Sequence, residues 1–125
     1  MNYLFDTNIL IYYFNGSLSE DVKKNISEML EHNFSISVIS KMEFLGFNKF
    51  TTQERVQADR FLSFAKIIPL EDSIVDRVIQ MKQNQKIKLP DAIIAATAIS
   101  KKLHLVTRNV KDFKDIDIKL NNPFQ

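Results

Sequence analysis

Cysteine is absent from this chain of 125 residues. Its absence excludes disulfides, thiolate nucleophiles and cysteine-based zinc sites, and is typical of a reducing compartment. With only two glycines, Gly16 and Gly46, there is no glycine-rich loop to bind nucleotide phosphates. No apolar run approaches the roughly 18–20 residues that span a bilayer, and no basic segment of a signal peptide precedes the first apolar stretch. We therefore expect a soluble, cytoplasmic protein that does not enter a membrane.

The chain has the composition of an ordinary globular domain, with 45% hydrophobic and 26% charged residues, and its length fits a single domain over 1–125. Short apolar runs typical of strands occur at 2–5, 34–39, 67–70, 103–106 and 116–120, with amphipathic or apolar helical segments between them. Such alternation predicts βαβ units, and hence an α/β fold in which helices cover both faces of a mostly parallel sheet.

Acidic and amide side chains follow the predicted strands. Asp6 comes directly after the first strand, Glu43 lies in the helix after the second, Asp91 opens an apolar helix, and Asn109 and Asp112 follow the fourth strand. Because ligands of parallel sheets bind outside the carboxyl ends of the strands, we expect these side chains to meet at one edge. Carboxylates gathered there repel one another unless a cation lies among them, and oxygen-only donors suit Mg²⁺ or Mn²⁺.

Each of these residues also has a purely structural interpretation. Glu43 lies three residues after Ser40, which is the spacing of a helix capping box. Asp91 at a helix N-terminus suits the helix dipole, and Asn109 could cap the turn that follows it. Asp6 is the hardest to explain in this way, because a carboxylate between a buried strand and an apolar helix is costly unless it is bonded or coordinated.

Basic residues are concentrated in the C-terminal third. The net charge is only +2, but residues 82–119 carry nine basic side chains against four acidic ones. Lys86, Lys88, Arg108 and Lys111 flank Asp91 and Asn109 in sequence. This arrangement favours contacts with a phosphate backbone, although a solvated lysine-rich surface is the alternative.

Four motifs, in this order, resemble those of the PIN-domain family: Asp6-Thr7-Asn8, Ser40-Lys41-Met42-Glu43, the segment LPDAIIAA at 89–96, and Thr107-Arg108-Asn109 followed by Asp112-Phe113. The resemblance covers essentially the whole chain, and its small size is similar to that of VapC-type ribonuclease toxins of toxin–antitoxin pairs. It implies a PIN-like three-layer fold with a five-stranded parallel sheet, an acidic pocket for Mg²⁺ or Mn²⁺, metal-dependent RNA hydrolysis, a homodimer and inhibition by a cognate antitoxin protein.

Carried over residue by residue, the three catalytic, metal-binding acids of the family fall on Asp6, Glu43 and Asp91. The fourth position, often an acid, falls on Asn109, which supplies an oxygen but no charge. Asp112 could compensate if its turn directs it inward. The resemblance also implies that Thr7 or Thr107 orients a ligand or a water.

Three functions follow from these observations. The first is an endoribonuclease that hydrolyses RNA phosphodiester bonds. The second is a catalytically weak PIN scaffold that binds RNA or a protein partner, favoured by Asn109 in place of an acid. The third, a phosphoaspartyl phosphatase, requires a second acid two residues after Asp6, but Asn8 occupies that position.

Overall fold

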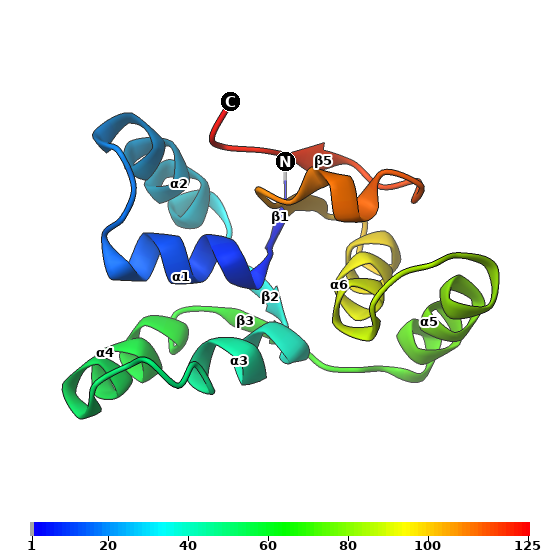
Figure 1. Ribbon diagram of the computed structural model, residues 1–125, viewed down its shortest axis with the longest axis horizontal. Helices are drawn as coiled ribbons and strands as arrows, with labels where there is room; N and C mark the ends of the chain where they lie inside the picture. Colours follow the sequence, from blue (N-terminus) through cyan, green and yellow to red (C-terminus); the bar gives the residue numbers. More distant parts are fainter. Residues whose placement is uncertain (1) are drawn as a thin grey trace.

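The computed structural model describes residues 2–125, in which short parallel strands alternate with helices (Figure 1). One sheet has the strand order β1-β4-β5, and a second pairs β2 with β3; every pairing is parallel. The strands are β1 (Tyr3–Phe5), β2 (Ser35–Ser37), β3 (Lys66–Ile68), β4 (His104–Val106) and β5 (Leu120–Asn121). The predicted α/β class with mostly parallel strands is confirmed.

The expectation of one continuous five-stranded sheet needs a correction. β1 and β2 lie next to each other, but no hydrogen-bonded ladder joins them within residues 2–125. The Tyr3 N–H instead donates to the side-chain oxygen of Asn33, which precedes β2. This side-chain contact takes a donor that a continuous ladder would use, so the strands divide into sheets of three and two.

Helices cover both faces of the strands (Figure 1). They are α1 (Thr7–Asn15), α2 (Glu20–His32), α3 (Val38–Leu45), α4 (Thr52–Leu62), α5 (Asp72–Asn84) and α6 (Leu89–Ser100), with a single 3₁₀ turn, η1 (Val110–Phe113). Alternate strand residues separate two cores: Leu4 and Leu105 pack with α5 and α6, whereas Phe5 and Val106 pack with α1 to α4. The result is the three-layer arrangement expected from the sequence.

The pairing of β1 with β4 determines where the residues after these two strands lie. Phe5 is in register with Val106, and the Asp6 N–H donates to the Val106 carbonyl at 2.9 Å. The first residues after the two strands, Asp6 and Thr107, therefore emerge side by side at the carboxyl edge of the sheet. Within residues 2–125, no helix is both long and apolar enough to cross a membrane.

Candidate active site

Asp6 links the end of β1 to the start of α1. Its backbone is extended (φ −69°, ψ 153°), and its carboxylate caps the helix by accepting from the Thr7 N–H at 2.8 Å. The other carboxylate oxygen accepts from the Thr107 hydroxyl at 2.8 Å and from the Asn8 amide at 3.2 Å. With only 5% of its surface exposed, Asp6 is a buried acid held by three donors.

Burial dominates the electrostatics of Asp6. The pKa of its carboxyl is raised from 3.8 to about 6, mainly because burial removes the carboxylate from water. The negative charges of Asp91 and Glu43 contribute to this rise, and the hydrogen bonds from Thr107 and Thr7 oppose it. Asp6 therefore lies within electrostatic range of both other predicted acids, which come from different helices.

Glu43 does not take part in a capping box. α3 begins at Val38 and is capped by Ser37, whose hydroxyl accepts from the Ile39 N–H, so Ser40 lies inside the helix. The Ser40 and Glu43 side chains instead meet the Thr7 hydroxyl, at 3.0 Å and 2.7 Å. Because Thr7 has one hydroxyl proton and a carboxylate can only accept, Thr7 donates to Glu43, and Ser40 is then the donor to Thr7.

Ser40 is a supporting residue that the sequence interpretation missed. It is fully buried, and it holds the hydroxyl that positions Glu43. The spacing of Ser40 and Glu43 could have indicated this supporting role, because residues three apart in a helix lie on the same face. Thr7 and Thr107, which were predicted as supporting residues, both contact predicted acids.

Asp91 lies in the first turn of α6, after Pro90. The pKa of its carboxyl is raised by burial, then by the charges of Asp112 and Glu43, and Lys88 opposes the rise. Asp91 thus couples electrostatically to acids on two sides. The predicted buried helix is confirmed, since α6 buries every side chain from Ala92 to Ala98.

A cavity of about 570 Å³ brings the predicted residues together. Its polar wall contains acids from three different elements, Asp6, Glu43 and Asp91, together with Asn109. The remaining lining residues are Thr7, Asn8, Ile11, Gly46, Phe47 and Asn48. Asn109 makes no side-chain capping bond to η1, so the capping interpretation does not account for it.

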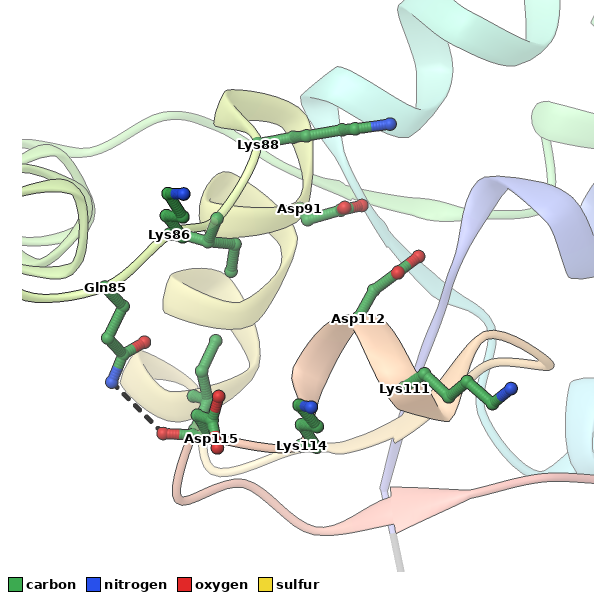
Figure 2. Close-up of a pocket in the computed structure, with 10 residues that line it drawn as sticks. Gln85, Lys86, Lys88, Asp91, Lys111, Asp112, Lys114 and Asp115 are labelled. Carbon is green, nitrogen blue, oxygen red and sulfur yellow. Dashed lines mark hydrogen bonds between the residues drawn. The ribbon is translucent and has the colours of Figure 1, made fainter.

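A second cavity, of about 220 Å³, lies on the other side of Asp91 (Figure 2). Asp112 lines this cavity and not the first one, and its carboxylate lies near that of Asp91. Four lysines surround the pair, namely Lys86, Lys88, Lys111 and Lys114. Three of them were predicted to contact RNA, and Lys114 was not. The fourth predicted contact, Arg108, lies outside this cavity, over the rings of Tyr12 and Phe124, and it lines a further cavity together with Lys111.

The donor set suits a hard cation. Among residues 2–125, no three acidic or histidine side chains are grouped so that they could together hold a metal ion. Mg²⁺, however, usually takes one or two carboxylates and completes its shell with water and substrate phosphate. The mutual repulsion of Asp6, Glu43 and Asp91 is the feature that such an ion would relieve. The buried Oδ1 of Asn8, which has no hydrogen-bond partner among the described residues, leaves a further oxygen uncommitted beside Asp6.

Comparisons with known proteins find a matching family model and similar solved structures. The sequence model of the PIN domain matches residues 3–119. A chain of a toxin–antitoxin complex from Klebsiella pneumoniae is 36% identical, with 99% of each chain covered and a TM-score of 0.80. A chain of VapBC2 from Rickettsia felis, bound to a promoter DNA fragment, is 30% identical, with 98% of each chain covered and a TM-score of 0.80.

A more distant structure shares the fold. A chain of DNA-bound VapBC from Salmonella typhimurium is 20% identical, with 98% of each chain covered and a TM-score of 0.81. No curated protein sequence matches the chain significantly.

Proposed function

This chain belongs to the PIN-domain family and is of the VapC type, and on that premise we propose that it is a divalent-metal-dependent endoribonuclease acting as the toxin of a toxin–antitoxin pair. Membership of this family supports a nuclease activity. The RNA substrate and the divalent ion are the parts that we propose. The observation that carries the proposal is the convergence of Asp6, Glu43 and Asp91 on one cavity, where burial and, to a smaller extent, the other two charges raise the pKa of Asp6.

Asp6, Asp91 and Glu43 would hold Mg²⁺ or Mn²⁺. Such an ion, when bound, neutralises charge that develops on a phosphodiester during hydrolysis. The chain itself fixes the carboxylates: Thr107 and the Thr7 N–H orient Asp6, while the Thr7 hydroxyl orients Glu43. Asn109 adds an uncharged oxygen at the same wall.

The lysines around Asp91 support a nucleic-acid substrate. Lys101–Glu71 is the one ion pair within residues 2–125, so Lys86, Lys88 and Lys111 have no acid partner at ion-pair distance. Figure 2 shows Lys88 extending above the Asp91 carboxylate. Unpaired cations beside an acidic cavity can hold the phosphates on either side of the scissile bond, which positions RNA without reading its sequence.

The partners are proposed from the relatives. Chains that are 36% and 30% identical to this one come from toxin–antitoxin complexes, so we propose a cognate antitoxin protein that binds this chain and blocks RNA cleavage. The family resemblance also predicts a homodimer, which light scattering of the purified chain will test.

The function is tested by cleavage of a single-stranded RNA with Mg²⁺ or Mn²⁺ and with EDTA. We expect cleavage only with metal, leaving 5′-phosphate and 3′-hydroxyl ends. Asp6→Asn, Glu43→Gln and Asp91→Asn should each lower the rate about 100-fold or more, because even indirect partners of a metal site cost 10–100-fold. Asp76→Asn, an exposed acid on α5, is the matched control. Metal-dependent cleavage that survives in all three site variants would refute the proposal.

A catalytically weak scaffold remains the second candidate, favoured by Asn109 in the position of a fourth acid. A scaffold would bind RNA or the antitoxin as tightly as we expect of the enzyme. It would give no cleavage above the level of the Asp6→Asn variant at any concentration of Mg²⁺ or Mn²⁺.

A further inference from the structure

The guanidinium of Arg108 lies over two aromatic rings. Its guanidinium carbon lies 4.5 Å from the ring centre of Phe124 and 5.4 Å from that of Tyr12. The two rings meet edge to face, with centres 5.8 Å apart. Both distances to Arg108 fall within the roughly 6 Å range of cation–π contacts.

The rings come from opposite ends of the chain and are firmly placed. Tyr12 belongs to α1, and Phe124 belongs to the segment after β5. The end of β5 is held by the Thr107 N–H, which donates to the Asn121 carbonyl at 3.0 Å, and the segment after it accepts from the Asn25 amide at the Pro123 carbonyl, at 3.5 Å. Within the segment, the Phe124 N–H donates to the Asn122 side chain at 3.0 Å. Pro123, which directly precedes Phe124, is buried. Phe124 is therefore a fixed part of the fold.

The N–H groups of Arg108 have no acceptor among residues 2–125. Within residues 2–125, Arg108 forms no ion pair and donates no side-chain hydrogen bond, and the residue is exposed. A cation–π contact does not use the N–H groups of a guanidinium as hydrogen-bond donors to an oxygen, and these N–H groups are the part that binds phosphate.

The position of Arg108 relates it to the acidic cavity. The preceding residue, Thr107, donates to Asp6, and the following residue, Asn109, lines the cavity with Asp6. Arg108 thus lies at the same edge of the sheet but apart from Lys86 and Lys88, which line the cavity beyond Asp91. An RNA strand crossing the acids would meet cations on two sides.

We propose that Tyr12 and Phe124 form an aromatic clamp that positions Arg108 to bind a phosphate of the RNA backbone. The proposal rests on the proposed function, since it names residues that hold the substrate of that site. In this role Phe124 is a positioning residue that acts through Arg108. Holding the arginine in place before RNA arrives lowers the entropy lost on binding.

The experiment measures binding of a fluorescein-labelled single-stranded RNA by anisotropy at several KCl concentrations, in an Asp6→Asn background that prevents cleavage. Arg108→Ala should weaken binding and reduce the salt slope by about 0.7, the value for one phosphate contact on a single strand. Phe124→Ala should weaken binding about two- to fivefold, the range of an exposed cation–π contact. Phe124→Trp should bind at least as tightly as the parent, but Phe124→Leu should not.

A double variant separates the clamp from ordinary packing. Phe124→Ala added to Arg108→Ala should cause no further loss of affinity, because the clamp acts only through the arginine. Phe64→Ala, which changes a ring that is 77% exposed and outside the clamp, should bind RNA like the parent. Thermal unfolding of each variant confirms that it is folded.

The outcomes distinguish the two proposals. If the wild-type chain neither cleaves nor binds RNA, the proposed function and the clamp both fail. If the wild-type chain cleaves RNA but Phe124→Ala binds like the parent, or Phe124→Leu binds as well as Phe124→Trp, the clamp alone is overturned.

Discussion

The hydroxyl of Thr107 donates a 2.8 Å hydrogen bond to Asp6, joining two buried residues that are 101 positions apart in the sequence. The same hydroxyl accepts from the Asn109 N–H at 3.0 Å. One buried side chain therefore fixes both the first predicted acid and the loop that carries the fourth site position. This link explains why Asn109 lines the cavity of Asp6 while Asp112, further along η1, lines the neighbouring one.

Asp6→Asn should stabilise the metal-free protein at neutral pH. The pKa of Asp6 is raised from 3.8 to about 6 on folding, so the folded state binds the proton more tightly than the unfolded state. The free energy of unfolding should therefore fall as pH rises from about 4 to about 6, and this group adds no further change above that range. A rise of about two pKa units corresponds to roughly 3 kcal/mol.

Urea unfolding between pH 4 and pH 8 in EDTA measures this effect. Asparagine can still accept from the Thr7 N–H, so the helix cap is kept, but its NH₂ cannot accept from Thr107 and Asn8, and this loss reduces the gain in stability. We expect a flatter pH profile for Asp6→Asn than for wild type, with a remaining slope of the same sign from Asp91, whose pKa is also raised. Parallel profiles for the two proteins would mean that burial of Asp6 does not perturb its ionisation.

Mn²⁺ should stabilise the folded chain, because a ligand that binds only the folded state adds RT ln(1 + [L]/Kd). At about 100 times Kd this gain is roughly 2.7 kcal/mol, equivalent to about 5–10 °C in Tm for a chain of this size. The Asp6→Ala/Asp91→Ala double variant should show no shift, and Asp76→Asn should shift like wild type. Equal shifts in wild type and the double variant would show that the ion binds elsewhere.

Ser40→Ala should weaken Mn²⁺ binding although Ser40 touches no predicted metal ligand. Its hydroxyl donates to Thr7, which in turn holds Glu43 at 2.7 Å, so its loss leaves the Thr7 oxygen without a donor and removes the support of the hydroxyl that orients the carboxylate. We expect several-fold weaker Mn²⁺ binding by calorimetry and a loss of about 1 kcal/mol of stability.

Ser100→Ala is the matched control for Ser40→Ala. The Ser100 hydroxyl is buried and has no partner among the described residues, so its removal should leave stability unchanged or slightly higher. If Ser40→Ala binds Mn²⁺ like wild type, the Thr7 hydroxyl alone suffices to position Glu43.

Two identical spacings show what the sequence could and could not predict. Thr51 and Glu54 form a complete capping box at the start of α4. Ser40 and Glu43 have the same spacing, but the N-cap of α3 is Ser37, which lies three residues before Ser40 at the end of β2. The local pattern is equal in both cases. Only the contact of Ser40 with Thr7, from a distant part of the chain, decides its role.

The convergence of the acids was predictable, but the position of individual turns was not. Parallel topology brings Asp6, Glu43 and Asp91 to one edge whatever the details of the loops, and the cavity confirms that they meet. Whether Asn109 or Asp112 faces them depends on the Thr107–Asn109 contact, which no sequence pattern records. The contact of Asn33 with Tyr3, where the two sheets meet without a ladder, is likewise not visible in any sequence pattern.

The position of Asn109 allows the sharpest prediction. Asn109 lines the cavity of Asp6, so Asn109→Asp adds a fourth charge there and should tighten Mn²⁺ binding. Asp112 lies in the neighbouring cavity and raises the pKa of Asp91. Asp112→Ala should therefore have a mild effect on Mn²⁺ affinity, far smaller than that of Asp91→Ala, if one ion is held by Asp6, Glu43 and Asp91. Calorimetric titration of wild type and the three variants measures these affinities at one pH. An unchanged affinity in Asn109→Asp, together with a loss in Asp112→Ala as large as that in Asp91→Ala, would transfer the fourth position to Asp112 and indicate a site built for two ions.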